Sequence, residues 1–321
     1  MGIINVSDLT VKYKVKKNFI TAVAGVSLDI SAGESAAIVG ESGCGKTTLA
    51  NALLKLLPEN AVVTGLVFMD AMDVLNADEE RLRSIRGKTA GMIFQEPGAS
   101  LNPLFSIKQQ IEETLTAHFG KMAAPALEQK SLELLNDAGI TDAQRVYNSY
   151  PHQLSGGLQQ RVMAAIALSC NPKILIADEP TTALDVTVQA QIVELLKKLK
   201  EEHNLTLLLI THDLHLANEL ASRIIVMYAG EIAEDGAIKD KKSALHPYTA
   251  ALFEIIPSLD SKKRQFTVIP GEVARPREGR DFCAFSPRCP YADDKCRSQK
   301  PELIEVKPGH FVRCFYPGGK K

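Results

Sequence analysis

Residues 35–57, SAAIVGESGCGKTTLANALLKLL, decide the fold of this chain. An apolar run is followed by a glycine-rich turn and then by apolar residues at helical spacing, which predicts strand, loop and helix in succession. The turn fits the pattern G-x-x-x-x-G-K-[ST] at Gly40, Gly45, Lys46 and Thr47. Backbone N–H groups of such a loop converge on phosphate oxygens, and the helix N-terminus adds a favourable dipole. The stretch therefore predicts a site for nucleotide phosphates.

The polar residues of this loop have separate roles. Lys46 brings a positive charge to the β- and γ-phosphates, and the Thr47 hydroxyl is a ligand for Mg²⁺. We interpret Cys44, in the loop, and Cys170, at the end of an apolar helix, as structural, with oxidation a liability of Cys44. The residues predicted to contact ATP here are Gly40, Ser42, Gly43, Cys44, Gly45, Lys46, Thr47 and Thr48.

A second apolar run, KILIADEP at 173–180, leads directly into two carboxylates. Acids at the C-terminal end of a parallel strand stand where α/β folds bind ligands. Asp178 suits the Mg²⁺ shell, and Glu179 suits a general base that polarises the attacking water. Acids in such places often only cap the next helix. Their occurrence together with the phosphate loop favours the catalytic interpretation.

A third stretch, LSGGLQQR at 154–161, places Ser155, Gly156 and Gly157 just before an apolar-periodic helix. A hydroxyl, exposed N–H groups and the positive end of a helix form a second anion site. An ordinary helix cap is the alternative for this stretch taken alone. A phosphate loop and a separate phosphate-seeking helix end in one chain indicate that two chains close over one nucleotide.

The rest of the chain reads as a largely parallel α/β fold. Buried strands are predicted at 35–40, 173–178 and 206–211, and the segment 186–203 between the last two has helical spacing. Strand, helix and strand in that order form a βαβ unit. Antiparallel β structure is expected before the loop, and residues 106–170 are nearly all helical in pattern. We predict a nucleotide-binding domain at 1–240, with a helical subdomain at about 100–170, and a C-terminal domain at 241–321.

Composition narrows the class of protein. The chain has 321 residues, a net charge of −1 and 45% hydrophobic residues, which is ordinary for a globular protein. A nucleic-acid-binding surface would need a basic excess that the total does not show. The N-terminal segment lacks the layout of a signal peptide, and no apolar run reaches the roughly 20 residues that cross a bilayer. We therefore expect a cytosolic protein with reduced cysteines.

In these motifs the sequence resembles the nucleotide-binding subunits of ABC transporters, over nearly its whole length. LSGG resembles the family signature, with Leu158 where the commonest form has Gln. By the same resemblance Gln95 in IFQEP is the Q-loop residue and a ligand of Mg²⁺ or water, and Asp185 in TALD belongs to the D-loop. His212 in LITHD matches the switch histidine, and Tyr13 the aromatic residue that stacks on adenine. The resemblance implies a P-loop NTPase (RecA-like) ABC cassette with an antiparallel β subdomain, a helical subdomain and a small C-terminal appendage.

The resemblance narrows to the oligopeptide, dipeptide and nickel importers. It is carried by GESGCGK, FQEPGASLNPLFSI, TTALDVTVQAQI, HPYTAAL at 246–252 and the tail with IPGEVARP. It implies an ATPase on the cytoplasmic face of the membrane, paired with a second ABC ATPase subunit and two permease subunits. An extracytoplasmic binding protein would deliver the substrate, so this chain does not separate dipeptide, oligopeptide and nickel.

The resemblance also implies a mechanism. ATP lies between the phosphate loop of one subunit and the signature of its partner, where Glu179 activates water and His212 orients the γ-phosphate. Gln95 relays closure to the permease. A non-transport ABC ATPase acting on ribosomes or DNA is the alternative, although its members usually carry two cassettes or large insertions. A metal-binding module with a degenerate cassette is disfavoured because every catalytic position is intact.

The last part of the chain carries Cys283, Cys289, Cys296 and Cys314. Their spacing is not the C-x₂-C pairing of zinc ribbons. Four thiolates in proline-punctuated loops suit either tetrahedral Zn²⁺ or a [4Fe–4S] cluster, and unligated thiols are a further alternative. The resemblance to the importer tail favours the cluster. None of the cassette motifs lies in this tail, so we expect Cys289→Ser to lose the metal while ATP binding stays largely intact.

Overall fold

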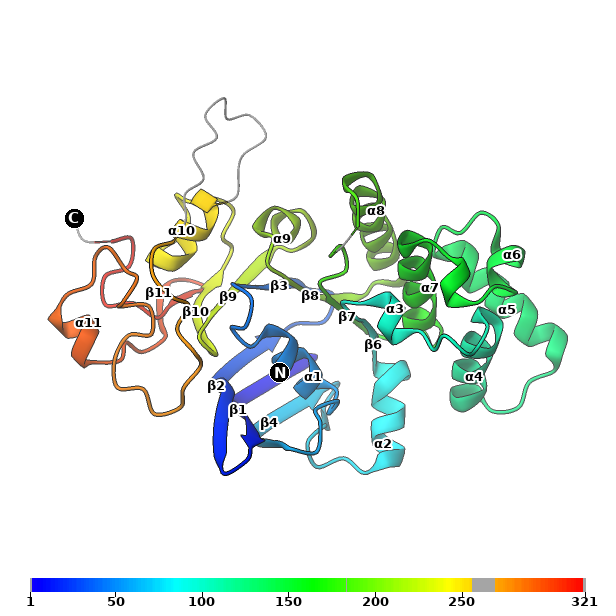
Figure 1. The fold of residues 1–321 in the computed structure, drawn as a ribbon, viewed down its shortest axis with the longest axis horizontal. Helices are drawn as coiled ribbons and strands as arrows, with labels where there is room; N and C mark the ends of the chain where they lie inside the picture. Colours follow the sequence, from blue (N-terminus) through cyan, green and yellow to red (C-terminus); the bar gives the residue numbers. More distant parts are fainter. Residues whose placement is uncertain (1, 183, 256–268, 320–321) are drawn as a thin grey trace. The chain divides into compact units, whose positions relative to one another are not determined.

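The computed structural model describes residues 2–182, 184–255 and 269–319, and the chain folds as two compact units. The first unit comprises Met1–Ile30, Ser35–Phe68 and Ile210–Lys321, and the second comprises Ser31–Glu34 and Met69–Leu209. Figure 1 labels elements of both units where there is room. No helix in the described ranges is long and apolar enough to cross a bilayer.

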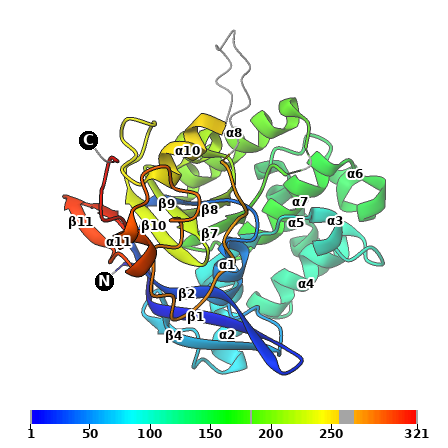
Figure 2. The same cartoon turned by 60° about the vertical axis from the view of Figure 1, so that its left-hand side comes forward.

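The first unit contains an antiparallel sheet and one edge of a mixed sheet. The strands β2, β1 and β4 lie side by side in both views, as Figures 1 and 2 show. The mixed sheet has the order β11-β12-β10-β9-β3, with β3 parallel to β9. The strands are β1 (Ile4–Val15), β2 (Asn18–Ile30), β3 (Ser35–Val39), β4 (Ala61–Met69), β9 (Arg223–Tyr228), β10 (Glu231–Gly236), β11 (Ile304–Lys307) and β12 (His310–Val312). The helices are α1 (Lys46–Leu53), α9 (Leu214–Leu220), α10 (Pro247–Ile255) and α11 (Asp294–Ser298).

The second unit combines parallel strands with most of the helices. The strands β8, β7 and β6 follow one another in that order, and β6 and β7 are parallel. The strands of this unit are β5 (Met72–Asp73), β6 (Ala90–Ile93), β7 (Ile174–Asp178) and β8 (Thr206–Thr211). The last residues of β8 belong to the first unit. The helices are α2 (Glu79–Ser84), the irregular turn η1 (Ile85–Thr89), α3 (Pro97–Ser100), α4 (Ile107–Phe119), α5 (Ala124–Asp137), α6 (Ala143–Tyr147), η2 (Pro151–Gln153), α7 (Gly156–Leu168) and α8 (Val186–His203).

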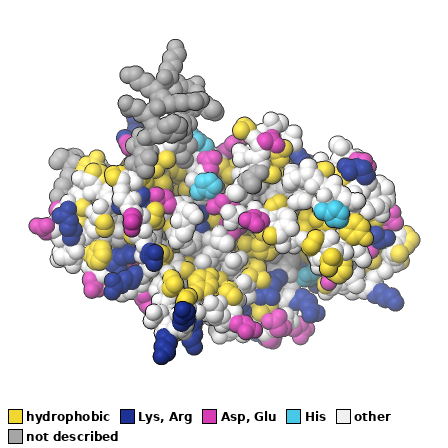
Figure 3. Space-filling model, in the orientation of Figure 1, with side chains coloured by type: hydrophobic (Ala, Val, Ile, Leu, Met, Phe, Trp, Pro, Cys, Tyr) yellow, Lys and Arg dark blue, Asp and Glu magenta, His cyan; other side chains and the backbone are white. Residues whose placement is uncertain are grey.

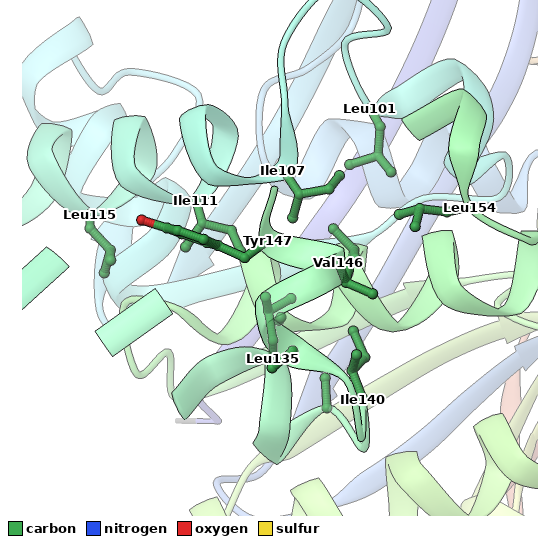
Figure 4. Packing of buried hydrophobic residues seen from close by; sticks show 13 residues of the cluster. Leu101, Ile107, Ile111, Leu115, Leu135, Ile140, Val146, Tyr147 and Leu154 are labelled. Carbon is green, nitrogen blue, oxygen red and sulfur yellow. The ribbon is translucent and has the colours of Figure 1, made fainter. Parts of the chain in front are cut away.

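The helices α4, α5, α6 and α7 share a core of their own. Ile107, Ile111, Leu135 and Tyr147 are fully or almost fully buried there, and Figure 4 shows them pointing toward one another. The start of α4 is fixed by a reciprocal capping box between Ser106 and Gln109. The helical pattern predicted for 106–170 is therefore confirmed, whereas the division into a separate subdomain, like the boundary at residue 240, stays a prediction.

The predicted strands also match the structure. The runs expected at 35–40, 173–178 and 206–211 form β3, β7 and β8, and all three are buried along their length. The helix expected at 186–203 is α8, with Asp185 as its N-cap. The antiparallel structure expected before the phosphate loop is the β1–β2 pair. Continuous apolar runs and a helical period thus locate the elements that carry the functional residues.

Candidate nucleotide site and cysteine cavity

The phosphate loop follows buried β3 and ends at α1, as the sequence predicts. Gly45 caps the helix with φ of +108°, a conformation that favours glycine. A Cβ atom at Gly45 would lie 2.3 Å from the Ala22 carbonyl oxygen, and one at Gly40 2.3 Å from that of Met227. Both positions therefore exclude any side chain, which is the condition for a loop whose N–H groups face a phosphate.

Lys46 is buried and bonded to its own loop. Its Nζ donates to the carbonyl oxygens of Gly40, at 2.8 Å, and Glu41, at 3.2 Å. Tyr13 lies beside the same loop, since its hydroxyl is 3.2 Å from Thr48 Oγ1. Cys44 is fully buried, and burial raises the pKa of its thiol. The neutral thiol is a poor nucleophile, so the structure does not favour the oxidation liability expected at this position.

His212 also belongs to the first unit, where it stands between β8 and α9. The turn that carries it is fixed on its C-terminal side by Asp213. The Asp213 N–H donates to Thr211 Oγ1 at 3.0 Å, and its carboxylate accepts from the N–H groups of His215 and Leu216. The histidine is thus held just past the carboxyl end of buried β8.

In the second unit the structure brings Gln95 and Glu179 together. Gln95 Nε2 donates to Glu179 Oε2 at 3.1 Å, and Thr182 Oγ1 donates to the same oxygen at 2.8 Å. Asp178 ends β7 and is 2% exposed. Glu179 has φ of +45°, which is rare for a residue with a side chain. Sequence reasoning missed Thr182, although it lies within the quoted TTALD segment.

The signature residues begin a helix, as expected. Ser155 is the N-cap of α7 and accepts from the Leu158 N–H at 3.4 Å. Asp185 caps α8 and accepts from the Val188 N–H at 3.0 Å. The two helix starts are close, since a Cβ atom at Gly157 would lie 2.7 Å from Val188 Cγ1. Gly156 stands beside Leu184 in the same way, and Val186 is exposed nearby.

The four tail cysteines line one cavity in the first unit. Cys283, Cys289, Cys296 and Cys314 share it with aromatic side chains that include Phe285, Phe315 and Tyr316. Burial raises the pKa of Cys283 to about 11 and that of Cys314 to about 12. No group of three or more His, Cys, Asp or Glu side chains within the described residues forms a ready set of ligands for a metal ion. The four cysteines line the same cavity, and their role as metal ligands stays a prediction.

Comparison with known proteins gives the family. The pattern described as "ABC transporter" matches residues 23–182, and that described as "Oligopeptide/dipeptide transporter, C-terminal region" matches 231–296. The oligopeptide transport ATP-binding protein AppD of Bacillus subtilis is 44% identical, over 98% of this chain and 96% of its own length. The dipeptide transport ATP-binding protein DppD of Escherichia coli is 42% identical, over 99% of this chain and 97% of its own length.

Solved structures agree on the fold. The dimeric cassette MJ0796, in a post-hydrolysis state bound to ADP and Pi, is 35% identical and superposes with a TM-score of 0.65. The match covers 73% of this chain and 98% of the cassette. The P-loop NTPase fold of an ABC cassette is therefore shown, and with it an ATP-hydrolysing enzyme. The chain belongs to the ATP-binding proteins of the oligopeptide and dipeptide ABC transporters.

Proposed function

We propose that this chain hydrolyses ATP to drive import of dipeptides or oligopeptides through a membrane permease. The observation that carries the proposal is the Glu179 carboxylate, held by Gln95 and Thr182 at the end of β7, in a chain similar over nearly its whole length to peptide-transport ATPases. The same similarity makes nickel a less favoured cargo. It also disfavours a non-transport ATPase acting on ribosomes or DNA.

The residues take the roles that their motifs imply. Lys46 and the loop N–H groups bind the β- and γ-phosphates, and Tyr13 stacks on adenine. Thr47, Asp178 and Gln95 supply the hard oxygen donors that Mg²⁺ prefers. The burial of Asp178 suits a carboxylate whose charge a cation balances. Glu179 is the general base, and Gln95 and Thr182 fix the oxygen to which they donate.

The signature end of α7 acts on the nucleotide of a second ATPase subunit. Ser155, Gly156 and Gly157 offer a hydroxyl and N–H groups at the start of a helix, and Asp185 stands beside them at the start of α8. The related cassette MJ0796 is described as a dimer bound to ADP and Pi, which supports this arrangement. His212 then orients the γ-phosphate for attack, and release of phosphate reopens the dimer.

Exposed apolar residues on both sides of Gln95 in the sequence suit the permease. Leu104 is 80% exposed, and Phe94 and Phe105 are also exposed, all in the second unit. Such residues suit an apolar segment of a partner more than solvent. On the face drawn in Figure 3, Lys and Arg are interspersed with Asp and Glu, which is unlike a nucleic-acid-binding surface. We therefore place the protein peripherally on the cytoplasmic face of the membrane, with two permease subunits.

The test is transport itself. The chain is co-expressed with candidate permease subunits and a second ATPase subunit from the same genome, and the complex is reconstituted into vesicles with a matching binding protein. Uptake of labelled di- and oligopeptides should require ATP on the side of the ATPase. Co-purification with ribosomes or DNA in place of a permease would contradict the proposal, and uptake of Ni²⁺ but not of peptide would reassign the cargo.

The cysteine cavity suits a metal centre, and we propose a [4Fe–4S] cluster. Four soft sulfur donors in an aromatic-lined cavity fit such a cluster. A tetrahedral zinc site would bring its sulfurs to within about 3.8 Å of one another. Anaerobic purification should give a brown protein with four iron atoms per chain; a colourless protein with one zinc would identify the alternative.

A further inference from the structure

Arg288, in the cysteine-rich tail, forms a forked ion pair with Glu41 of the phosphate loop. Its Nη1 donates to Glu41 Oε2 at 2.7 Å and its Nη2 to Glu41 Oε1 at 3.0 Å. The arginine side chain is 3% exposed and the glutamate side chain 22%. Bidentate pairing of this kind fixes both the position and the plane of the carboxylate. A residue of the tail thus orients a residue of the nucleotide loop.

The Arg288 guanidinium is also held by hydrogen bonds to groups other than Glu41. Its Nε donates to the carbonyl oxygen of Pro270 at 3.1 Å, and its Nη2 to that of Ile269 at 3.2 Å. Its Nη1 also lies 3.4 Å from the Tyr228 hydroxyl. Removal of either Glu41 or Arg288 would leave the other charge buried without its partner, so breaking this ion pair costs free energy whichever residue is replaced. Glu41 is therefore held by a rigid donor.

Tyr248 holds the same loop residue through its backbone. The Glu41 N–H donates to the Tyr248 hydroxyl at 2.9 Å. Tyr248 is fully buried, and its ring packs against Tyr228 and Phe285 at centroid distances of 4.6 and 5.4 Å. It belongs to the HPY segment of α10, which sequence reasoning used only as a family marker. Glu41 is thus held at its side chain and at its N–H group.

The position of Glu41 matters because the phosphate-binding Lys46 donates a hydrogen bond to its carbonyl oxygen. Lys46 Nζ donates to the carbonyl oxygens of Gly40 and Glu41, the peptide groups at the start of the loop. A loop whose start is fixed loses less conformational freedom when the phosphates bind. Release of Glu41 would allow the loop to sample other conformations and would weaken the binding of ATP.

We propose that Arg288 and Tyr248 are positioning residues for the phosphate loop, so that the C-terminal region sets the affinity of the chain for ATP. The proposal rests on the proposed function of residues 40–48 as the phosphate site. Neither residue contacts the nucleotide in this mechanism. Both act through Glu41.

The first test measures ATP·Mg²⁺ binding by calorimetry on the full-length chain. Arg288→Ala should weaken ATP binding about tenfold, the size of a typical coupling between contacting residues. The matched control is Arg297→Ala, since Arg297 pairs with Asp294 in the same tail but on its exposed surface. Tyr248→Phe, which deletes only the hydroxyl, should weaken binding about threefold, in the range of one hydrogen bond. Thermal unfolding and metal content are measured for each variant.

A double-mutant cycle separates positioning from general damage. If Arg288 acts through Glu41, then Glu41→Gln and Arg288→Gln should each weaken binding about tenfold, and the double variant no more than either. Arg288→Lys keeps the charge without the fork and should restore part of the affinity. If the double variant instead weakens ATP binding by the product of the two single effects, the residues act independently and the proposal is overturned. So would an Arg288→Ala variant that binds ATP as tightly as the wild-type chain.

Two further outcomes are assigned in advance. If Arg288→Ala does not fold, Glu41→Gln and Tyr248→Phe decide, and unchanged ATP affinity in both overturns the proposal. If the wild-type chain binds no ATP, or Lys46→Ala binds it equally well, the assignment of the loop fails and the inference with it. If Lys46→Ala loses binding while the Arg288 and Tyr248 variants keep it, only the inference fails.

Discussion

At the scale of single residues, Glu179 combines a strained backbone with a fixed carboxylate. A positive φ costs about 1 to 3 kcal/mol for a residue with a side chain, and such strain collects at functional sites. Here it occurs at +45°, between the buried Asp178 and the turn that carries Thr182. The conformation directs the side chain to two donors at once, which supports its role as the general base.

We expect Glu179→Gln to bind ATP with near wild-type affinity and to hydrolyse it at least about 100-fold more slowly, because an amide cannot accept the proton of water. The dimer should accumulate in its ATP-bound form. Phosphate release and size-exclusion chromatography with ATP measure the two effects. Undiminished turnover would show that another group is the base.

Thr182→Val removes the hydroxyl donor but keeps the shape of the side chain. Since hydrogen bonds to charged groups contribute about 1.5 to 3 kcal/mol, kcat should fall about tenfold or more. The KM for ATP should change little, because Thr182 contacts Glu179 and not the nucleotide. Thr182→Ser restores the donor and should recover most of the rate. Equal losses in the Val and Ser variants would indicate a packing role instead.

At the scale of elements, the loop between Gln95 and α4 exposes Leu104 and Phe105, although Leu101 of the same loop is buried in the core of the adjoining helices. Leu104→Glu should leave ATP binding by the isolated subunit unchanged and abolish co-purification with the permease, because a charge would enter an apolar contact. Affinity pull-down with a tagged permease measures this. Asp137→Lys, a charge change at the exposed last residue of α5, is the control. Retention of Leu104→Glu in the complex would place the permease contact elsewhere.

The start of α10 predicts a dependence of stability on pH. His246 is buried, and burial lowers its pKa to about 4. Its ring Nδ1 accepts from the Tyr248 N–H, and its backbone N–H donates to the Glu234 carboxylate. Arg313 lies close by. The imidazole binds a proton more readily in the unfolded chain than in the folded chain. Neutral His246 therefore makes its full contribution to the free energy of unfolding above about pH 6.5, and this contribution is lost as the pH falls toward 4. The full loss is about 3 kcal/mol.

Denaturant unfolding at pH 7.5 and pH 5 measures that dependence. His246→Asn keeps an acceptor for the Tyr248 N–H and should flatten the difference between the two pH values. His152→Asn, on an exposed residue of the second unit, should leave the difference as it is. Identical pH dependence in wild type and His246→Asn would assign the effect to other groups.

At the scale of the whole molecule, local patterns in the sequence locate most of the site. Gly40, Gly45 and Lys46 occupy their predicted places because a strand, a tight turn and a helix are encoded by neighbouring residues. Gln95 and Glu179, each singled out in the sequence, are joined by a hydrogen bond, and the four cysteines line one cavity. What the sequence does not reveal is long-range pairing. Glu41 and Arg288 are 247 residues apart; Glu41 stands at a position that the phosphate-loop pattern leaves unspecified, and Arg288 lies outside every cassette motif.

That contact revises the expectation for Cys289→Ser. The Arg288 N–H donates to the Phe285 carbonyl oxygen within the turn that carries Cys283 and Cys289. If the proposed metal is bound there, its loss should move Arg288, and we expect Cys289→Ser, or removal of the metal by a chelator, to weaken ATP binding several-fold. Iron and zinc content and ATP titration are measured on the same samples. A metal-free chain that binds ATP with full affinity would show that the metal does not influence ATP binding and that its role in the tail is purely structural.

The place of Arg288 beside a cysteine also has a practical consequence for work at the bench. A sample exposed to air during purification could carry an intact set of nucleotide motifs and still perform as though its Lys46 loop were damaged. Differences in specific activity between preparations would then follow their iron and thiol content and not their sequence. Oxygen would belong among the controlled variables of every ATP measurement on this protein.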